Sequence, residues 1–551
     1  MRSLVRLTMG AVAIFGFNLA LQAQDALPQK KVRFPSARES AARMTVPEGF
    51  EVKVFAAEPA VVNPIGIDFD HEGRAYVLEC LQYPKKAPIG NKGADRIRVY
   101  EDTKGTGVAD KVTTFAEGLN LATGIAVGYG GVFVGEAPYL LFLEDTKGTG
   151  KADKRTVLLD GFGYQDTHET LNSFIWGPDG WLYGCHGVFT HSKVGKPGTP
   201  DKDRVPLNAG IWRYHPKTHK FEVFAEGTSN PWGYDYDENG SGFLTACVIP
   251  HLFHIVPGGL YIRQAGQNFN PYAYGQIREI CDHVHYFGDS SHVGNIDPRR
   301  FAVGGGHAHS GCLIYQGGAY PEKWNGRVFM MNLHGARINT DILKRNGSTY
   351  IGSHGEDLLV ANDPNFRAIQ LRTGPDGSIY MTDWYDPQIC HNPDPNIWDR
   401  DTGRIYKVVY KDAKQTHAHG LHPVGFDLEK LSSEQLVDLL KDTNSWWWRQ
   451  ALLILQERGD KSVAPRLKEM VNKSEEYRHA LRALWALNNI GAFDEDFGRE
   501  TLEHANPWVR AWAVRLLGQL DRNLNEKTWE RLEELAKDKS PDVRLQLAAS
   551  C

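Results

Sequence analysis

Histidine, asparagine and aspartate residues able to act as acids, bases or ligands recur beside turn sequences in the first 420 residues. His168 stands nine residues before Gly-Pro-Asp-Gly in DTHETLNSFIWGPDGWLYG. An imidazole with a pKa near neutrality can take a proton from a hydroxyl group. The sequence therefore predicts His168 as a catalytic base. The alternative is a loop histidine that only orders its own hairpin.

Other polar residues hold comparable places in neighbouring segments. Asn230 opens NPWG and Asp383 lies in TDWYD, while GGGHAHSG and HGARIN supply further candidates. We expect Asn230 and Asp383 to join His168 as catalytic residues. The residues expected to bind a cofactor are Asn230, His307, His309 and Arg337.

Histidines are dense between residues 251 and 309. The pairs His283/His285 and His307/His309 would each place two imidazoles on one face of an extended strand, and HLFH adds His251 and His254. Imidazole is a common ligand of transition metals, so a metal site is one interpretation. A hydrogen-bonded network beside a channel is the other.

Two copies of EDTKGTGxADK begin at residues 101 and 144. They are similar to calcium loops, in which alternate carboxylates surround the ion. Lys104 and Lys147 occupy ligand positions, where an ammonium would repel Ca²⁺. Turns between strands are therefore predicted in preference to ion sites.

The elements that must position these residues are six similar hairpins. Each combines an apolar strand, a turn rich in Gly, Asp or Pro-Asp-Gly, and a second apolar strand. They begin at Asn63, Leu121, Asn172, Asn230, His309 and Arg367. Repeated units of this size stack radially. We expect an all-β six-bladed β-propeller over residues 45–412, closed by GRIYKVVY against the first blade, with function at one mouth of its channel.

Composition changes near residue 420, since only five of the 56 glycines follow it. Helical spacing of apolar residues predicts four helix pairs, over residues 431–458, 463–489, 501–521 and 529–550. Arg449, Arg478, Arg510 and Arg544 recur in them. We expect a 413–430 linker and then an all-α HEAT-type solenoid over 431–551, incomplete at its C-terminus, that buries its own core and docks a protein partner.

The N-terminus is typical of an exported protein. Basic residues precede a short apolar run and small residues, which predicts a signal peptide over residues 1–23, followed by a 24–44 linker. The alternative is an uncleaved anchor that leaves the protein membrane-associated; either way we expect a secreted or periplasmic location. The net charge of −5 gives no reason to expect nucleic acid as a partner. Seven scattered cysteines without CxxC favour buried free thiols.

Several motifs together resemble a known family. They are VPEGFEVKVFAAEP, EDTKGTGxADK, NSFIWGPDGWLYG, GTSNPWGYDYD, GGGHAHSG, MTDWYD and CHNPDPNIWDRDTGRIYKV. The chain resembles the membrane-bound dehydrogenase domain family of planctomycetes and verrucomicrobia, a glucose/sorbosone dehydrogenase-like propeller followed by HEAT repeats.

The resemblance implies an extracytoplasmic, quinone-dependent oxidation of a sugar or other alcohol. Pyrroloquinoline quinone would lie in the channel mouth, with Ca²⁺ as a further candidate cofactor and a c-type cytochrome as electron acceptor. His168 matches the family's base. The family's Arg-Asn pair before Pro-x-Gly reads Ser229-Asn230 here, and Arg337 is the candidate to replace the missing guanidinium.

Two other functions stay open. A metal-dependent lactonase would hold a divalent ion with Glu, Asn, Asn and Asp from different blades, and this chain offers Glu79, Asn172, Asn230 and Asp383. A glycan- or protein-binding propeller with a scaffolding solenoid would need no catalytic residue.

Overall fold

The computed structural model describes residues 34–88, 90–273, 275–284, 308–389, 392–413, 425–520 and 523–550. Ala37–Cys551 forms one compact unit; of the preceding unit, Met1–Ser36, only residues 34–36 are described. The predicted signal peptide, His285 and His307 lie outside the described residues. Within those residues, no helix has the length and apolar character needed to cross a membrane.

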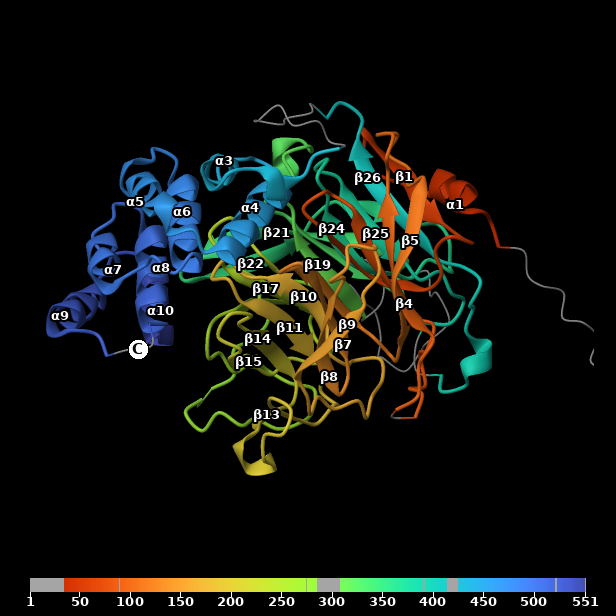
Figure 1. The fold of residues 1–551 in the computed structure, drawn as a ribbon, viewed down its shortest axis with the longest axis horizontal. Coiled ribbons are helices and arrows are strands. Elements are labelled where there is room, and N and C mark those ends of the chain that lie inside the picture. The colour runs from red at the N-terminus through yellow and green to blue at the C-terminus, as the bar shows by residue number, and fades with distance from the viewer. Residues whose placement is uncertain are drawn as a thin grey trace, which may run out of the picture. The chain divides into compact units, whose positions relative to one another are not determined.

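Six antiparallel sheets form a six-bladed β-propeller (Figure 1). Blade one contains β2 (Pro64–Phe69), β3 (Ala75–Glu79), β4 (Asp95–Glu101) and β5 (Lys111–Leu119). Blade two contains β6 (Gly124–Gly128), β7 (Gly131–Glu136), β8 (Tyr139–Glu144) and β9 (Lys154–Leu159). Blade three contains β10 (Asn172–Trp176), β11 (Leu182–His186), β14 (Gly210–Tyr214) and β15 (Phe221–Glu226), with β12 (Ser192–Val194) and β13 (Val205–Leu207) as a separate ribbon.

The other three blades complete the ring. Blade four contains β16 (Pro231–Tyr236), β17 (Gly242–Ala246) and β18 (Leu252–Ile255). Blade five contains β19 (His309–Ile314), β20 (Val328–Asn332), β21 (Arg337–Asn346), β22 (Thr349–His354) and β23 (Leu359–Val360). Blade six contains β24 (Ala368–Thr373), β25 (Ile379–Asp383), β26 (Arg404–Tyr410) and β1 (Phe50–Ala57).

The six predicted hairpins are the two inner strands of the six blades, which confirms the propeller. Neighbouring inner strands contact one another in the order β2, β6, β10, β16, β19, β24 and back to β2. The ring closes differently from the prediction. Strand β26 pairs with β1, which is the outer strand of blade six, so the two ends of the propeller meet within one blade.

The turn residues act as predicted. In blade four the Asp237 carboxylate accepts the amides of Asn239 (2.9 Å) and Ser241 (2.8 Å), and Gly240 has a φ of +75°. Such side-chain bonds and positive φ values fix a tight turn between antiparallel strands.

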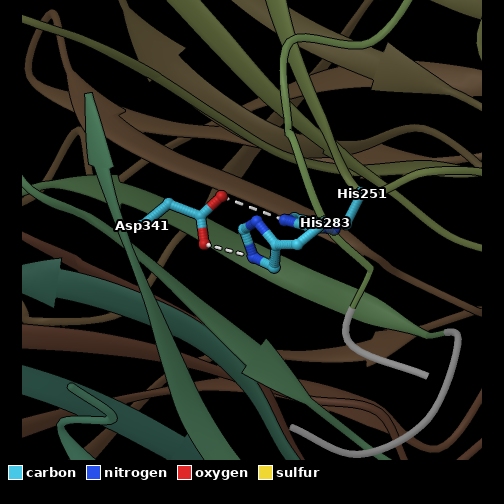
Figure 2. Close-up of side chains that lie close together, drawn as sticks. All are labelled: His251, His283 and Asp341. Carbon is cyan, nitrogen blue, oxygen red and sulfur yellow. Dashed lines mark hydrogen bonds and ion pairs between the residues drawn. The ribbon is translucent and has the colours of Figure 1, made fainter. Parts of the chain in front are cut away.

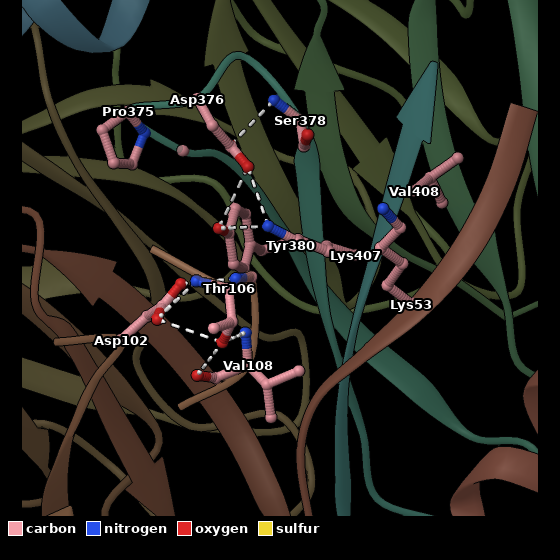
Figure 3. Close-up of polar contacts among 12 residues, drawn as sticks. Lys53, Asp102, Thr106, Val108, Pro375, Asp376, Ser378, Tyr380, Lys407 and Val408 are labelled. Carbon is pink, nitrogen blue, oxygen red and sulfur yellow. Dashed lines mark hydrogen bonds and ion pairs between the residues drawn. The ribbon is translucent and has the colours of Figure 1, made fainter. Parts of the chain in front are cut away.

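The EDTKGTG segments are turns, as predicted. The Asp102 carboxylate accepts the amide of Thr106 (3.0 Å; Figure 3) and that of Gly107 (2.5 Å). Asp110 pairs with Lys104. The loop's own amides and lysine therefore occupy these carboxylates. Asp145 bonds Thr149 and Gly150 in the same way in the second copy.

The described residues from 425 onward form four helix pairs, consistent with a helical solenoid. The pairs are α3 (Ser433–Leu439) with α4 (Ser445–Arg458), α5 (Ala464–Lys473) with α6 (Tyr477–Asn489), α7 (Glu495–Thr501) with α8 (Pro507–Gly518), and α9 (Glu526–Leu535) with α10 (Pro541–Ser550). The third pair begins earlier than predicted. A further helix, α1 (Ala37–Arg43), packs against β1.

The solenoid packs on the hairpin turns of the propeller. Side chains of the second helices donate to turn carbonyls: Trp447 to Pro375 (3.0 Å), Gln456 to Gly180 (2.7 Å) and Trp512 to Asn239 (2.7 Å). One buried apolar cluster contains residues of both parts. Other buried clusters lie wholly within the propeller, so it has core residues of its own in addition to the cluster that it shares with the helices.

Two of the repeated arginines hold this junction. Arg449 pairs with Asp235 of β16 (2.7 Å), and Arg478 pairs with Glu238 of the next turn (2.9 Å). The repeat pattern predicts that these arginines pack between helices. In the structure their guanidiniums also bind the propeller.

Candidate functional site

The starts of the inner strands converge on a cavity of about 140 Å³. They lie at the opposite end of those strands from the turns that the solenoid covers, so the helices leave this mouth of the propeller uncovered. All six blades contribute to its lining: Ile65, Cys80, Tyr83, Thr123, Thr167, His168, Asn230, Trp232, Cys247, Val248, Ala308, Ser310, Leu333, Arg367, Ile369, Trp384, Ile389 and Trp398.

His168 lines this cavity from the loop before β10. Its side chain is 20% exposed, and its Nδ1 hydrogen-bonds with the Asp166 carboxylate. A carboxylate in this position orients the ring and stabilises the imidazolium that forms when the ring accepts a proton. The structure thus gives His168 the surroundings that a general base needs.

A buried carboxyl group stands behind this pair. Glu169 accepts the amides of Val188 (3.1 Å) and Phe189 (2.7 Å). Burial and the nearby Asp166 charge raise the pKa of Glu169 to about 8. Glu169 therefore holds the loop that carries His168.

Asn230 lines the same cavity at the start of blade four. Its backbone has a φ of +38°, and its side-chain Oδ1 accepts the amide of Val188 (3.3 Å). Two of the three predicted catalytic residues, His168 and Asn230, are thus brought to one cavity.

Asp383 is buried behind the lining. Its Oδ1 accepts the amides of Arg367 (2.8 Å) and Tyr385 (3.0 Å), and burial raises its pKa to about 7. It is not among the cavity-lining residues, although Arg367 and Trp384 beside it are. The Asp383 carboxylate thus fixes the backbone of Arg367, which lines the cavity.

The predicted cofactor-binding residues are placed less favourably. His309 is fully buried and contacts the Asn332 amide through Nε2 (3.1 Å). Arg337 pairs with Asp357 (2.8 Å) and does not line the cavity. Because that carboxylate already binds it, Arg337 does not take the place of the family's missing arginine. His307 is outside the described residues.

Arg367 is the mouth residue that the sequence analysis missed. Arg367 lines the cavity, and its guanidinium donates to the carbonyls of Phe366 (2.8 Å), Pro387 (3.4 Å) and Leu333 (3.5 Å). The available signal was its place at the start of the sixth hairpin, equivalent to Asn230 in the fourth.

The residues predicted as a lactonase-type metal set do not meet at the cavity. The Glu79 carboxylate accepts from Arg96 (2.5 Å), Tyr100 (2.8 Å) and the amide of Val62 (3.3 Å). Asn172 donates to the carbonyls of Thr170 and Pro231. Neither residue is in the lining.

Aromatic rings form much of the wall. The Tyr83 ring lies 5.0 Å from that of Trp398 and 5.9 Å from that of Trp384, and Trp232 is also in the lining. Aromatic faces contact apolar C–H surfaces, and the few polar groups fix orientation. The mouth thus suits a small ligand with both apolar and hydroxyl surface.

A larger cavity, of about 570 Å³, lies beside the hairpin turns. In it Lys407 donates to Asp376 (3.0 Å), which also accepts from Tyr380 (3.3 Å) (Figure 3). Its lining includes Asn444 and Phe426 from the C-terminal region. Lys407, Asp376 and Tyr380 are hydrogen-bonded to one another at the junction of the two parts. We therefore take the mouth, and not this cavity, as the candidate functional site.

Fold and site together define a six-bladed β-propeller with a solenoid on its turn face and a histidine–carboxylate pair in its open mouth. The chain belongs to the DUF7133 family, described as a domain of unknown function, whose model matches residues 36–412. Comparison with curated proteins finds no match.

Solved structures of similar fold include two sugar dehydrogenases. The aldose sugar dehydrogenase of Streptomyces coelicolor, solved with pyrroloquinoline quinone, is 15% identical over 66% of this chain and 100% of its own, with a TM-score of 0.40. An oxidoreductase described as a glucose dehydrogenase, from Thermus thermophilus, is 16% identical over 65% and 100%, also with a TM-score of 0.40. A protein described as a gluconolactonase is 11% identical over 68% and 96%, with a TM-score of 0.37. At these identities the likeness is one of fold.

Proposed function

We propose that the propeller mouth binds a sugar or another small polyol and that His168 removes a proton from one of its hydroxyl groups. The observation that carries the proposal is the His168–Asp166 pair in a cavity to which all six blades contribute. The motifs' resemblance to glucose/sorbosone dehydrogenases supports the same chemistry, and the basic and apolar N-terminal segment supports an exported protein.

The reaction is the oxidation of an alcohol. As the carbonyl forms, the hydroxyl proton passes to His168 and the hydride on the same carbon leaves to an acceptor. Asp166 stabilises the imidazolium that results. Asn230 and Arg367, on blades four and six, supply polar groups that can orient the sugar.

The described lining does not fit pyrroloquinoline quinone as a resident cofactor. That molecule carries three carboxylates, whereas Arg367 is the one guanidinium among the described lining residues, and backbone carbonyls already hold it. Ser229 replaces the family's arginine and donates to Gln264 (2.6 Å). A neutral polyol suits this lining better, with a separate quinone or dye as hydride acceptor.

Ca²⁺ fits the mouth no better. Hard cations require several oxygen ligands, mostly carboxylates. The described lining residues include no Asp or Glu.

The test is binding and turnover on the purified full chain. Sugars and polyols are titrated by calorimetry, and oxidation is followed with a soluble quinone or a redox dye as acceptor. We expect saturable binding at one site and acceptor reduction dependent on the sugar. Failure of every sugar and polyol to bind would refute the proposal. Binding with no turnover under any acceptor would leave a glycan-binding propeller.

A further inference from the structure

A second cluster of polar side chains lies behind the mouth. Asp341 of β21 directs its two carboxylate oxygens at two different imidazoles (Figure 2). Oδ2 lies 3.0 Å from His251 Nε2, and Oδ1 lies 3.4 Å from His283 Nε2. One potential ligand atom from each residue falls within 4.8 Å of the others.

The cluster joins segments far apart in the sequence. His251 precedes β18 of blade four, and Asp341 lies in β21 of blade five; both side chains are fully buried. His283 is 20% exposed and follows Cys281, whose backbone bridges to Gly352 of β22. The arrangement therefore depends on blades four and five being held together.

We propose that His251, His283 and Asp341 bind a divalent transition-metal ion, with Zn²⁺ as the representative. Two atoms each about 2.1 Å from an ion, at tetrahedral or octahedral angles, are about 3.0–3.4 Å apart. The two nitrogen–oxygen distances agree with this spacing. Small side-chain shifts suffice to close the set around an ion.

The donor types select the class of ion. Two imidazoles and one carboxylate suit zinc and neighbouring first-row metals, whereas Ca²⁺ and Mg²⁺ prefer all-oxygen sites. Zinc sites with three protein ligands keep a fourth position for water, so the two imidazoles, the carboxylate and one water molecule would complete a tetrahedral set.

The site serves the architecture of the mouth. The His309 ring lies 5.0 Å from that of His251, and the His309 carbonyl accepts from Cys247 (3.3 Å). Cys247, Ala308 and Ser310 line the mouth cavity, but the three ligands do not. The ion would thus fix the wall between blades four and five without touching the sugar.

The test uses the full chain, freed of metal by a chelator and dialysis. Zn²⁺ is titrated by calorimetry, and Co²⁺ is followed by visible absorption, which reports the coordination number. We expect one ion per chain, a tetrahedral Co²⁺ spectrum and a higher melting temperature with Zn²⁺. His283→Ala, on the exposed side of the cluster, should weaken binding at least tenfold and lose the thermal shift.

The matched control is His254→Gln, in the same HLFH segment. His254 contacts Thr349 Oγ1 (3.2 Å) outside the cluster, so this variant should bind Zn²⁺ as the wild type does. Asp341→Asn should abolish binding, and if it fails to fold the His283→Ala result decides. No binding of Zn²⁺ or Co²⁺ at millimolar concentration, or unchanged binding by His283→Ala, would overturn the proposal. Turnover of His168→Gln tests the mouth separately, because His168 belongs neither to the metal ligands nor to their surroundings.

Discussion

At the scale of single residues, burial and local bonding determine which polar groups can take part in chemistry. His168 contacts a carboxylate and lines the mouth, whereas Glu79 and Arg337 are bound by partners that satisfy their charge. A side chain of a suitable type can take part in a reaction only if the folded structure leaves it in contact with the bound ligand.

His168→Gln tests the base directly. Glutamine retains much of the shape and hydrogen bonding but cannot accept a proton at neutral pH. Turnover should fall at least about 100-fold, which is the lower end of the rate enhancement that general acid–base catalysis contributes. Sugar affinity should change by less than about threefold. Calorimetry and acceptor reduction measure the two effects. His191→Gln, at an exposed position, is the control; an equal loss of binding and turnover in His168→Gln would contradict the assignment.

Asp383 makes stability depend on pH. Its pKa is raised to about 7, so the folded state favours the protonated form, and this stabilisation is complete below about pH 4 and lost as pH rises through about 7. Asparagine does not ionise. Between pH 5 and pH 8, Asp383→Asn should therefore lose less free energy of unfolding than the wild type, by on the order of 2–3 kcal/mol. Urea denaturation at both pH values measures this; parallel losses would show that Asp383 is not buried as described.

At the scale of elements, a buried ion cluster ties α8 to blade three. The Asp179 carboxylate accepts from Arg515 of α8 (2.8 Å), Tyr183 (2.7 Å) and Arg213 (3.2 Å), and burial excludes solvent from these groups. The two arginines keep the pKa of Asp179 below its usual range despite its burial. Asp179, which the sequence predicts as a turn residue of the third hairpin, thus also joins the propeller to the helices.

Asp179→Asn should destabilise the protein strongly. Loss of the carboxylate removes the charge partner of the buried Arg515, while Arg213 keeps Glu222, and breaking such a buried pair costs about 3–5 kcal/mol. Chemical denaturation measures the change. Asp201→Asn, whose side chain is 82% exposed and 3.4 Å from Lys193, should change stability by less than about 0.5 kcal/mol. A small effect of Asp179→Asn would mean that the junction does not depend on this cluster.

At the scale of the whole molecule, the propeller and the solenoid share one buried apolar cluster. Phe69 and Tyr380 of the propeller belong to the same buried cluster as Trp446 and Trp447 of α4. The Phe426 ring lies 4.7 Å from that of Trp447 and covers the junction from the segment before the helices.

Calorimetry of the full chain should therefore show a single unfolding transition. A chain ending at residue 412 would expose the propeller's share of the cluster, and we expect it to melt at least several degrees lower or to aggregate. Two well-separated transitions in the full chain, or a truncated propeller with an unchanged melting temperature, would show that the parts fold independently.

Short-range patterns in the sequence were enough to predict the elements. Turn residues and alternating apolar strands act within about 20 residues, so the six hairpins from Asn63 to Arg367 were predictable, as were the four helix pairs from their apolar spacing. His168 and Asn230 were predictable as mouth residues because they stand at equivalent points of repeated units.

Which side chains meet depends instead on how the elements pack in three dimensions. Packing between blades four and five brings His251 to Asp341 across 90 residues. The loop before β23 brings Asp357 to Arg337 within blade five, and Arg367 is left at the mouth. The docking of α4 and α8 on the turns likewise follows from surface shape and buried charge rather than from either repeat. Local hydrogen bonding and periodicity fix an element, whereas the partners of a buried polar group depend on packing between elements that no short pattern records.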